Sequence, residues 1–158
     1  MLINILIIFA SLLFLYLMAC LSFYIFQYKL IFKPDCEKVY DASDFELPEK
    51  SLFIPAGDHQ IHLCEYVHSG KKAPWLIFFH GNSGNLSGRL DTIKLLYDQG
   101  FNCLIFDYRG YGQSSGSACE NSLYADAETT VHYLEKRSGQ KAEDFHYFGR
   151  SLGGAVAI

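Results

Sequence analysis

The sequence predicts an α/β protein in which a mostly parallel sheet with flanking helices follows one N-terminal transmembrane helix. Two observations carry this prediction. The first 28 residues are largely apolar and carry no charged side chain, and the remainder alternates short apolar segments with segments of helical periodicity. Such alternation is typical of parallel strands joined by right-handed crossover connections.

Beyond the apolar segment the composition is that of an ordinary folded domain. All 13 Lys and Arg and all 17 Asp and Glu of the 158-residue chain lie after Tyr28, and the net charge is −4. This balance argues against a disordered or collagen-like chain and against a basic nucleic-acid-binding protein. The five cysteines form no C-x-x-C pair and show no metal-like spacing with histidine. They predict neither a metal site nor a particular redox compartment.

The stretch from Leu2 to Phe26 has the length of a membrane-spanning helix. Its 25 residues would cover about 37 Å as a helix, enough for a hydrocarbon core of roughly 30 Å. A cleaved signal peptide is the alternative, but the apolar run is long, no Lys or Arg precedes it and no A-x-A-like site follows. We therefore expect a single-pass membrane anchor at residues 1–28 and a connector at 29–49, with the side of the membrane left open.

Five strands are expected in the remainder of the chain. Residues 51–54 and 60–67 flank the turn sequence Pro-Ala-Gly-Asp and predict a β-hairpin. Trp75 to Phe79 (WLIFF) and Cys103 to Phe106 (CLIF) are short and continuously apolar, as expected of strands buried on both faces. Phe145 to Phe148 (FHYF) is a third strand of this series.

Helical periodicity lies between these strands. Apolar residues recur at helical spacing from Leu86 to Tyr97 and again from Leu123 to Leu134, with a helix end near Gly139. Ser117 and Glu120 fit a capping box at the approach to the second helix.

A third helix begins within residues 151–158 and is too short to cover its share of the sheet. We therefore expect residues 50–158 to be the N-terminal part of a larger domain, incomplete at its C-terminus.

The run Gly149-Arg150-Ser151-Leu152-Gly153 matches G-x-S-x-G between the last strand and the last helical segment. This position predicts a nucleophile elbow, a sharp turn that exposes the serine hydroxyl and needs small flanking residues. The helix that follows directs its free N–H groups and the positive end of its dipole at the reacting centre. A glycine-rich turn without a catalytic role is the alternative, but the flanking strand and helix favour the elbow.

A second candidate element is the loop His80-Gly81-Asn82-Ser83-Gly84-Asn85, directly after the WLIFF strand. In elbow enzymes one oxyanion donor is the backbone N–H after the nucleophile, here Leu152, and the other comes from a loop after an earlier strand. Asn82 is the expected second donor and Gly81 the close alternative. Because this chemistry uses backbone N–H groups, we expect the His80 side chain to be structural.

Three segments together resemble the α/β-hydrolase superfamily: Phe78 to Leu90 (FFHGNSGNLSGRL), Phe106 to Gly116 (FDYRGYGQSSG) and Phe148 to Ile158 (FGRSLGGAVAI). They are most similar to its Bem46-like and ABHD13-like membrane-anchored serine hydrolases. The resemblance implies an α/β-hydrolase-type sheet, and it implies no metal and no organic cofactor.

Carried over position by position, the resemblance implies that Ser151 is the nucleophile and that Asn82 and Leu152 are backbone donors of an oxyanion hole. It also implies three loop-shaping residues in the DYRGYG segment, namely Asp107, Arg109 and Tyr111.

The chain departs from the family pattern in one respect. Such enzymes carry Asp or Glu and then His after the nucleophile, but no acidic residue and no histidine follows Ser151. His132 and His146 lie on a predicted helix and a predicted strand, not in the family's catalytic position. The expected function is a membrane-anchored serine hydrolase of ester, thioester or amide bonds that lacks its downstream acid and base. The alternative is a non-catalytic membrane protein, either truncated or a pseudoenzyme.

The expected partners follow from these separate observations. The apolar N-terminal segment predicts the lipid bilayer, the charge balance argues against nucleic acid, and the resemblance implies an acyl-containing or lipid-like small molecule. The oligomeric state stays open.

Overall fold

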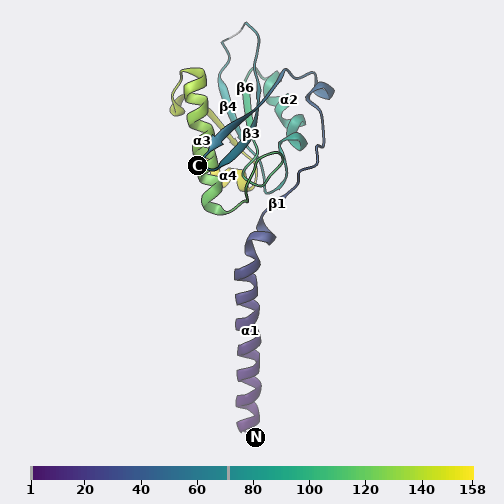
Figure 1. Cartoon of the computed structure of the whole chain (residues 1–158). Coiled ribbons are helices and arrows are strands. Elements are labelled where there is room, and N and C mark those ends of the chain that lie inside the picture. Colours follow the sequence, from purple (N-terminus) through teal and green to yellow (C-terminus); the bar gives the residue numbers. More distant parts are fainter. Residues whose placement is uncertain (1, 71) are drawn as a thin grey trace. The chain divides into compact units, whose positions relative to one another are not determined.

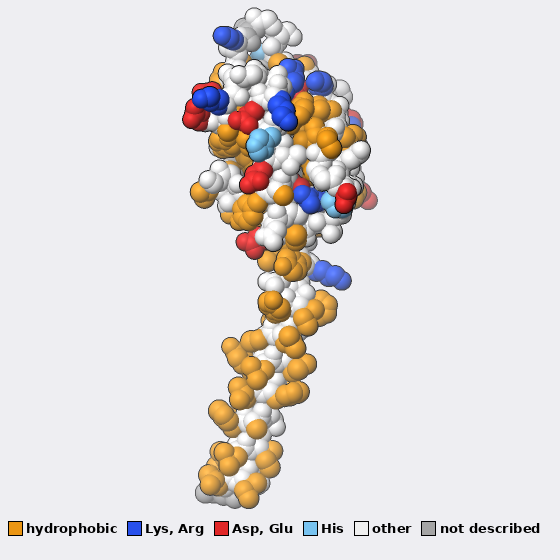
Figure 2. Space-filling view, turned by 60° about the vertical axis from the view of Figure 1, so that its left-hand side comes forward, with side chains coloured by type: hydrophobic (Ala, Val, Ile, Leu, Met, Phe, Trp, Pro, Cys, Tyr) orange, Lys and Arg blue, Asp and Glu red, His pale blue; other side chains and the backbone are white. Residues whose placement is uncertain are grey.

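The computed structural model describes residues 2–70 and 72–158 and divides into two compact units, one ending at Ile31 and the other running from Phe32 to Ile158. The first unit is the helix α1 (Leu2–Ile31), none of whose residues is buried and whose side chains are mostly hydrophobic over the face seen in Figure 2. Its 30 residues extend about 45 Å. By length and composition α1 can cross a membrane, and a signal sequence has the same properties.

The second unit is built on a mixed five-stranded sheet with the spatial order β2-β3-β6-β4-β7 (Figure 1). The strands are β2 (Glu49–Ala56), β3 (His59–Tyr66), β4 (Trp75–Phe79), β6 (Asn102–Phe106) and β7 (His146–Gly149). The predicted hairpin is confirmed as the antiparallel pair β2–β3, with a longer first arm and a second arm that begins and ends one residue earlier than predicted. Strand β3 is also antiparallel to β6, whereas β6, β4 and β7 are parallel to one another.

Helices cover both faces of this sheet (Figure 1). They are α2 (Leu90–Asp98), preceded by the 3₁₀ turn η2 (Leu86–Arg89), and α3 (Glu120–Ser138), with the short α4 (Leu152–Val156) after β7. Two further 3₁₀ turns are η1 (Ala42–Phe45) and η3 (Ala142–Asp144). Apolar side chains from α3 join one core cluster and those from α2 join the other. Because both faces are covered, every residue of β4 is buried, as predicted for WLIFF.

The start of α3 differs from the sequence prediction. Its N-cap is Cys119, whose backbone N–H donates to Ser122 Oγ at 2.8 Å. The capping box predicted at Ser117 and Glu120 is therefore wrong, because the chain enters the helix two residues later. The end of the helix is as predicted, since Gly139 adopts a left-handed conformation with φ 72°.

Strand β7 also differs from the other parallel strands. It forms one edge of the described sheet, and all four of its residues are exposed. Tyr147 and Phe148 expose 40% and 38% of their surface. The expectation that the strand before Ser151 is buried is wrong for the described residues, because β7 pairs with β4 on one side.

The segment after α1 is bound to the loop that follows β4. Strand β1 (Lys33–Pro34) pairs in parallel with β5 (Ser83–Gly84). The Asn85 side-chain amide donates to the carbonyl oxygens of Asp35 at 2.9 Å and Glu37 at 2.7 Å. The sequence predicts a connector at residues 29–49. Because of these bonds, the first residues of that connector are part of the packing around the loop 80–85.

Candidate active site

Ser151 lies at the turn between β7 and α4 in a conformation that L-residues rarely adopt. Its dihedral angles are φ 53° and ψ −118°, and its surface is exposed. A non-glycine residue in such a sparsely populated region costs about 1–3 kcal/mol and persists only where surrounding contacts impose it. Similar strain is common at catalytic residues.

Close packing of glycines imposes this turn. A Cβ on Gly149 would lie 2.5 Å from both Gly153 O and Gly154 Cα. A Cβ on Gly153 would lie 2.5 Å from Phe79 C and 2.6 Å from His80 O. All four distances are below van der Waals contact, so α4 can approach the ends of β7 and β4 this closely only because these positions lack side chains.

The loop 80–85 lies beside this turn. A Cβ built on Gly81 would be 3.6 Å from Ser151 Cβ and 3.4 Å from Arg150 O. The predicted neighbours, the serine and the loop after the earlier strand, are therefore brought together. Leu152 is the first residue of α4, and Asn82 follows Gly81 on the adjoining loop.

The Asn82 carbonyl is held on two sides. It accepts the Lys33 backbone N–H at 2.9 Å and the Tyr111 hydroxyl at 2.9 Å. Burial raises the pKa of Tyr111 to about 12, so its hydroxyl stays protonated and able to donate at neutral pH. These bonds fix the orientation of the peptide that carries the Asn82 carbonyl.

His80 is enclosed beneath the same loop. Its side chain is fully buried, its Nδ1 lies 2.7 Å from Gly81 O, and its ring centroid lies 4.6 Å from that of Tyr108. Burial lowers the pKa of His80 despite the nearby Asp107 carboxylate, which favours a neutral ring with Nδ1–H donating to Gly81. In this arrangement the imidazole braces the loop, in agreement with the structural role expected for it.

The DYRGYG residues contact backbone and buried charge. Asp107 Oδ1 accepts the Leu86 N–H at 2.7 Å, which fixes the start of η2. The Arg109 guanidinium Nε lies 2.6 Å from Oδ1 of the fully buried Asp126. Burial raises the pKa of Asp126, and its bonds with Arg109 act in the opposite direction.

The histidines considered from the sequence lie on other elements. His132, on α3, lines a cavity of about 720 Å³ together with Tyr147 and Ile158. His146 begins β7 and packs edge-on against Phe101 with ring centroids 5.1 Å apart, whereas Ser151 follows the opposite end of that strand. In the part of the chain that the structure describes, no three His, Cys, Asp or Glu side chains are arranged to hold a metal ion.

Comparison with known proteins places this geometry in a family. The sequence profile of the alpha/beta hydrolase fold matches residues 74–158, which include β4, the loop 80–85 and the Ser151 turn. The chain belongs to the α/β hydrolase family. Protein bem46 of Schizosaccharomyces pombe is a relative with 38% identity over 127 residues, covering 77% of this chain and 42% of bem46.

A second relative and a solved structure are also similar to this chain. The uncharacterized protein Rv2307c of Mycobacterium tuberculosis is 33% identical over 130 residues, covering 76% of this chain and 46% of that protein. An esterase of Pyrococcus furiosus has the same fold, with a TM-score of 0.67 and 21% identity, covering 80% of this chain and 49% of the esterase. The chain thus spans a little under half the length of these relatives.

Proposed function

We propose that this chain carries the nucleophile and the oxyanion-binding donors of a membrane-anchored serine hydrolase. Ser151 Oγ attacks an ester, thioester or amide carbonyl, and the backbone N–H groups of Asn82 and Leu152 receive the negative charge that develops on its oxygen. The observation that carries the proposal is the exposed, strained Ser151 with the Gly81 loop beside it.

The proton acceptor for Ser151 is proposed to come from outside residues 1–158. All six histidines precede Ser151, and the family order is serine, acid, histidine. The relatives contain more than twice the matched length, which leaves room for an acid and a histidine. Because serine is a weak nucleophile without a base, turnover by residues 1–158 alone should be slow.

The substrate is proposed to be an acyl ester or a similar lipid-like molecule. The structurally similar Pyrococcus furiosus protein is an esterase, which favours an ester, and α1 would place the domain close to acyl chains. We also propose that residues 1–28 stay attached as an anchor, that 29–49 connect it and that 50–158 form the hydrolase part. A carbonate wash should leave the protein in the membrane pellet, and a mature N-terminus after residue 28 would refute this.

The nucleophile is tested with a fluorophosphonate probe on the full-length gene product in membranes, with adducts located by peptide mass spectrometry. We expect an adduct on Ser151 that Ser151→Ala removes. Ser83→Ala is the matched control, because Ser83 is an exposed serine of the neighbouring loop. Equal labelling of the 151 peptide and the Ser83 peptide in the unaltered protein would overturn the proposed role.

A non-catalytic membrane protein is the second candidate, favoured by the absence of acid and histidine after Ser151. It predicts no Ser151 adduct in the full-length gene product although the protein is folded. The same labelling experiment therefore separates the two functions, with the circular dichroism spectrum as the check of folding.

A further inference from the structure

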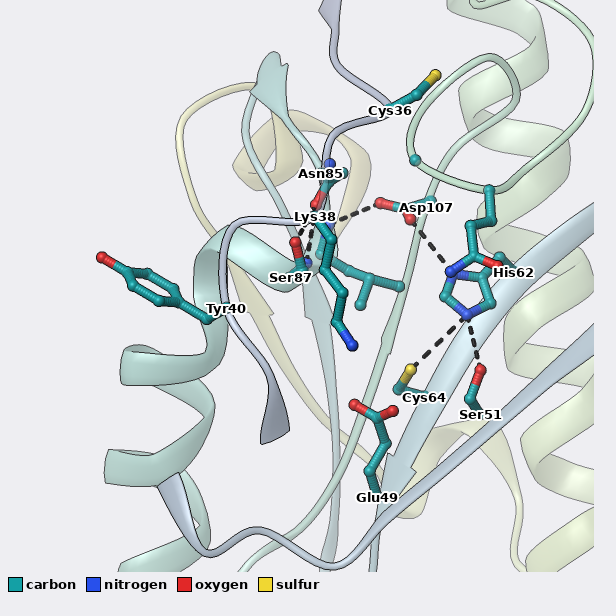
Figure 3. Close-up of a pocket in the computed structure, with 13 residues that line it drawn as sticks. Cys36, Lys38, Tyr40, Glu49, Ser51, His62, Cys64, Asn85, Ser87 and Asp107 are labelled. Atoms are coloured by element: carbon teal, nitrogen blue, oxygen red, sulfur yellow. Dashed lines mark hydrogen bonds and ion pairs between the residues drawn. The ribbon is translucent and has the colours of Figure 1, made fainter. Parts of the chain in front are cut away.

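A second serine, on the edge strand of the sheet opposite to β7, faces a histidine and an aspartate. Ser51 is on β2, His62 is on β3 and Asp107 follows β6. Ser51 Oγ lies 2.8 Å from His62 Nε2, and His62 Nδ1 lies 3.4 Å from Asp107 Oδ2. Figure 3 shows the imidazole between the serine hydroxyl and the carboxylate. The two ring nitrogens thus face different partners, as in a Ser-His-Asp triad.

The protein holds the histidine and the aspartate rigidly. The backbone N–H of His62 donates to Ser114 Oγ at 2.8 Å, and the Ser114 hydroxyl donates to the backbone carbonyl oxygen of Asp107 at 2.6 Å. The Asp107 N–H in turn donates to His62 O at 2.9 Å. The side chains of His62 and Asp107 are 4% and 1% exposed. Such a locked pair is the arrangement needed to present a base to a nucleophile.

The contacts also select the tautomer. A carboxylate accepts hydrogen bonds, so Asp107 favours the proton on His62 Nδ1 and leaves the Nε2 lone pair for the Ser51 hydroxyl. Cys64 Sγ is also near Nε2, at 3.9 Å. Burial raises the pKa of Cys64 to about 12 and its side chain is enclosed, so the thiol is not a competing nucleophile. Ser51 is the exposed member of the group.

We propose that Ser51, His62 and Asp107 form a second serine nucleophile site, which accepts small acyl groups from activated esters. The serine borders a cavity of about 60 Å³ that is also lined by Lys38, Glu49 and His62 (Figure 3). This volume suits an acetyl-sized group. Ser51 and Ser151 belong to β2 and to the turn after β7, at opposite edges of the sheet, so the two sites are separate.

The reaction at this site is acyl transfer to the serine oxygen. Ser51 Oγ forms a bond to the ester carbonyl carbon, its proton moves to His62 Nε2, and Asp107 stabilises the imidazolium that results. Collapse of the tetrahedral adduct breaks the bond to the leaving oxygen, which takes the proton back from Nε2. The products are acyl-Ser51 and an alcohol.

The test uses p-nitrophenyl acetate on the whole chain in detergent micelles, with acetylation of each serine measured by peptide mass spectrometry over time. Ser43 is the internal reference, because it is another exposed serine of the same unit. General-base assistance predicts that Ser51 is acetylated on the order of 10²-fold faster than Ser43. His62→Gln should bring Ser51 down to the rate of Ser43, and Ser51→Ala should remove the adduct.

Two results would overturn the proposal: equal acetylation rates at Ser51 and Ser43, or an unchanged Ser51 rate in His62→Gln. If His62→Gln fails to fold, the unaltered protein in concentrated urea replaces it, and the advantage of Ser51 must vanish there. Ser151→Ala should leave Ser51 acetylation unchanged. The acetylation of Ser51 is therefore measured independently of the fluorophosphonate adduct at Ser151. Either proposal can be refuted without affecting the other.

Discussion

The substitution Gly153→Ala tests how closely α4 packs against β4. The added Cβ would lie 2.5 Å from Phe79 C and 2.6 Å from His80 O, and closer still to Phe79 O. These are backbone atoms and cannot rotate away. Relaxing the carbon–carbon contact to about 3.5 Å requires a shift of roughly 1 Å between the helix and the strand. Overpacking of this kind costs about 1–3 kcal/mol, more than the roughly 0.5–1 kcal/mol that alanine gains over glycine in a helix.

Gly154→Ala is the matched control. The nearest atom to a Cβ there is Gly149 O at 3.7 Å, an ordinary contact. We expect the control to gain about 0.5–1 kcal/mol from its helix preference, so that Gly153→Ala is less stable than Gly154→Ala by about 2 kcal/mol.

Urea unfolding of the full chain in detergent measures this difference. The chain has one tryptophan, Trp75, and it is buried at the start of β4, the strand whose end receives the methyl group. Phe79 O also accepts the Arg150 N–H at 3.0 Å, so hydrogen exchange of the Arg150 amide should accelerate in Gly153→Ala. Equal stability of the two alanine variants would refute the packing on which the elbow geometry depends.

Three further predictions concern stability. Arg109→Met should destabilise the protein by about 3–5 kcal/mol at neutral pH, because it leaves the buried Asp126 carboxylate without its cationic partner, although the backbone N–H of residue 109 still donates to it. Since burial already raises the pKa of Asp126, protonation of this carboxylate as the pH falls should restore part of the lost stability. Urea unfolding at pH 7 and pH 5 measures this recovery. An equal loss of stability at both pH values would contradict the prediction. Ser151→Gly should be more stable than Ser151→Ala by about 1 kcal/mol in thermal unfolding, because glycine tolerates φ 53°; the reverse order would argue against strain. Asn85→Asp removes the amide that donates to the carbonyl oxygens of Asp35 and Glu37, and should lower the stability by about 1–3 kcal/mol. It should also accelerate tryptic cleavage after Lys38. An unchanged cleavage rate would show that these bonds do not hold the segment after α1 in place.

Local patterns were sufficient where one physical cause dominates. WLIFF was predicted as a buried strand from Trp75 to Phe79, and β4 has these bounds because helices cover both of its faces. The position of the loop 80–85 beside Ser151 could be predicted because the order of strand, loop and G-x-S-x-G motif fixes which chain ends meet in a parallel sheet.

Features set by pairing across distant segments could not be predicted in the same way. Ser51 meets His62 because the hairpin register pairs Ser51 with Cys64 and Phe53 with His62, which puts the serine diagonal to the imidazole. Asp107 joins them only because β3 lies beside β6. The spacing of these residues in the sequence carries no signal of the contact. The contact could be predicted only by combining the alternation of side chains along the two hairpin strands with the register that the turn between them imposes.

The attachment of the segment after α1 has a practical consequence for preparing a shortened protein that lacks α1. Phe32 is 8% exposed and belongs to the hydrophobic core, and backbone groups of Lys33, Asp35 and Glu37 are bonded to the loop 80–85. Truncation just before Phe32 would keep these contacts. Truncation at residue 49, where the hairpin starts, would remove the hydrogen bonds that hold the loop 80–85. A protein prepared for crystallisation without α1 should therefore begin at residue 32.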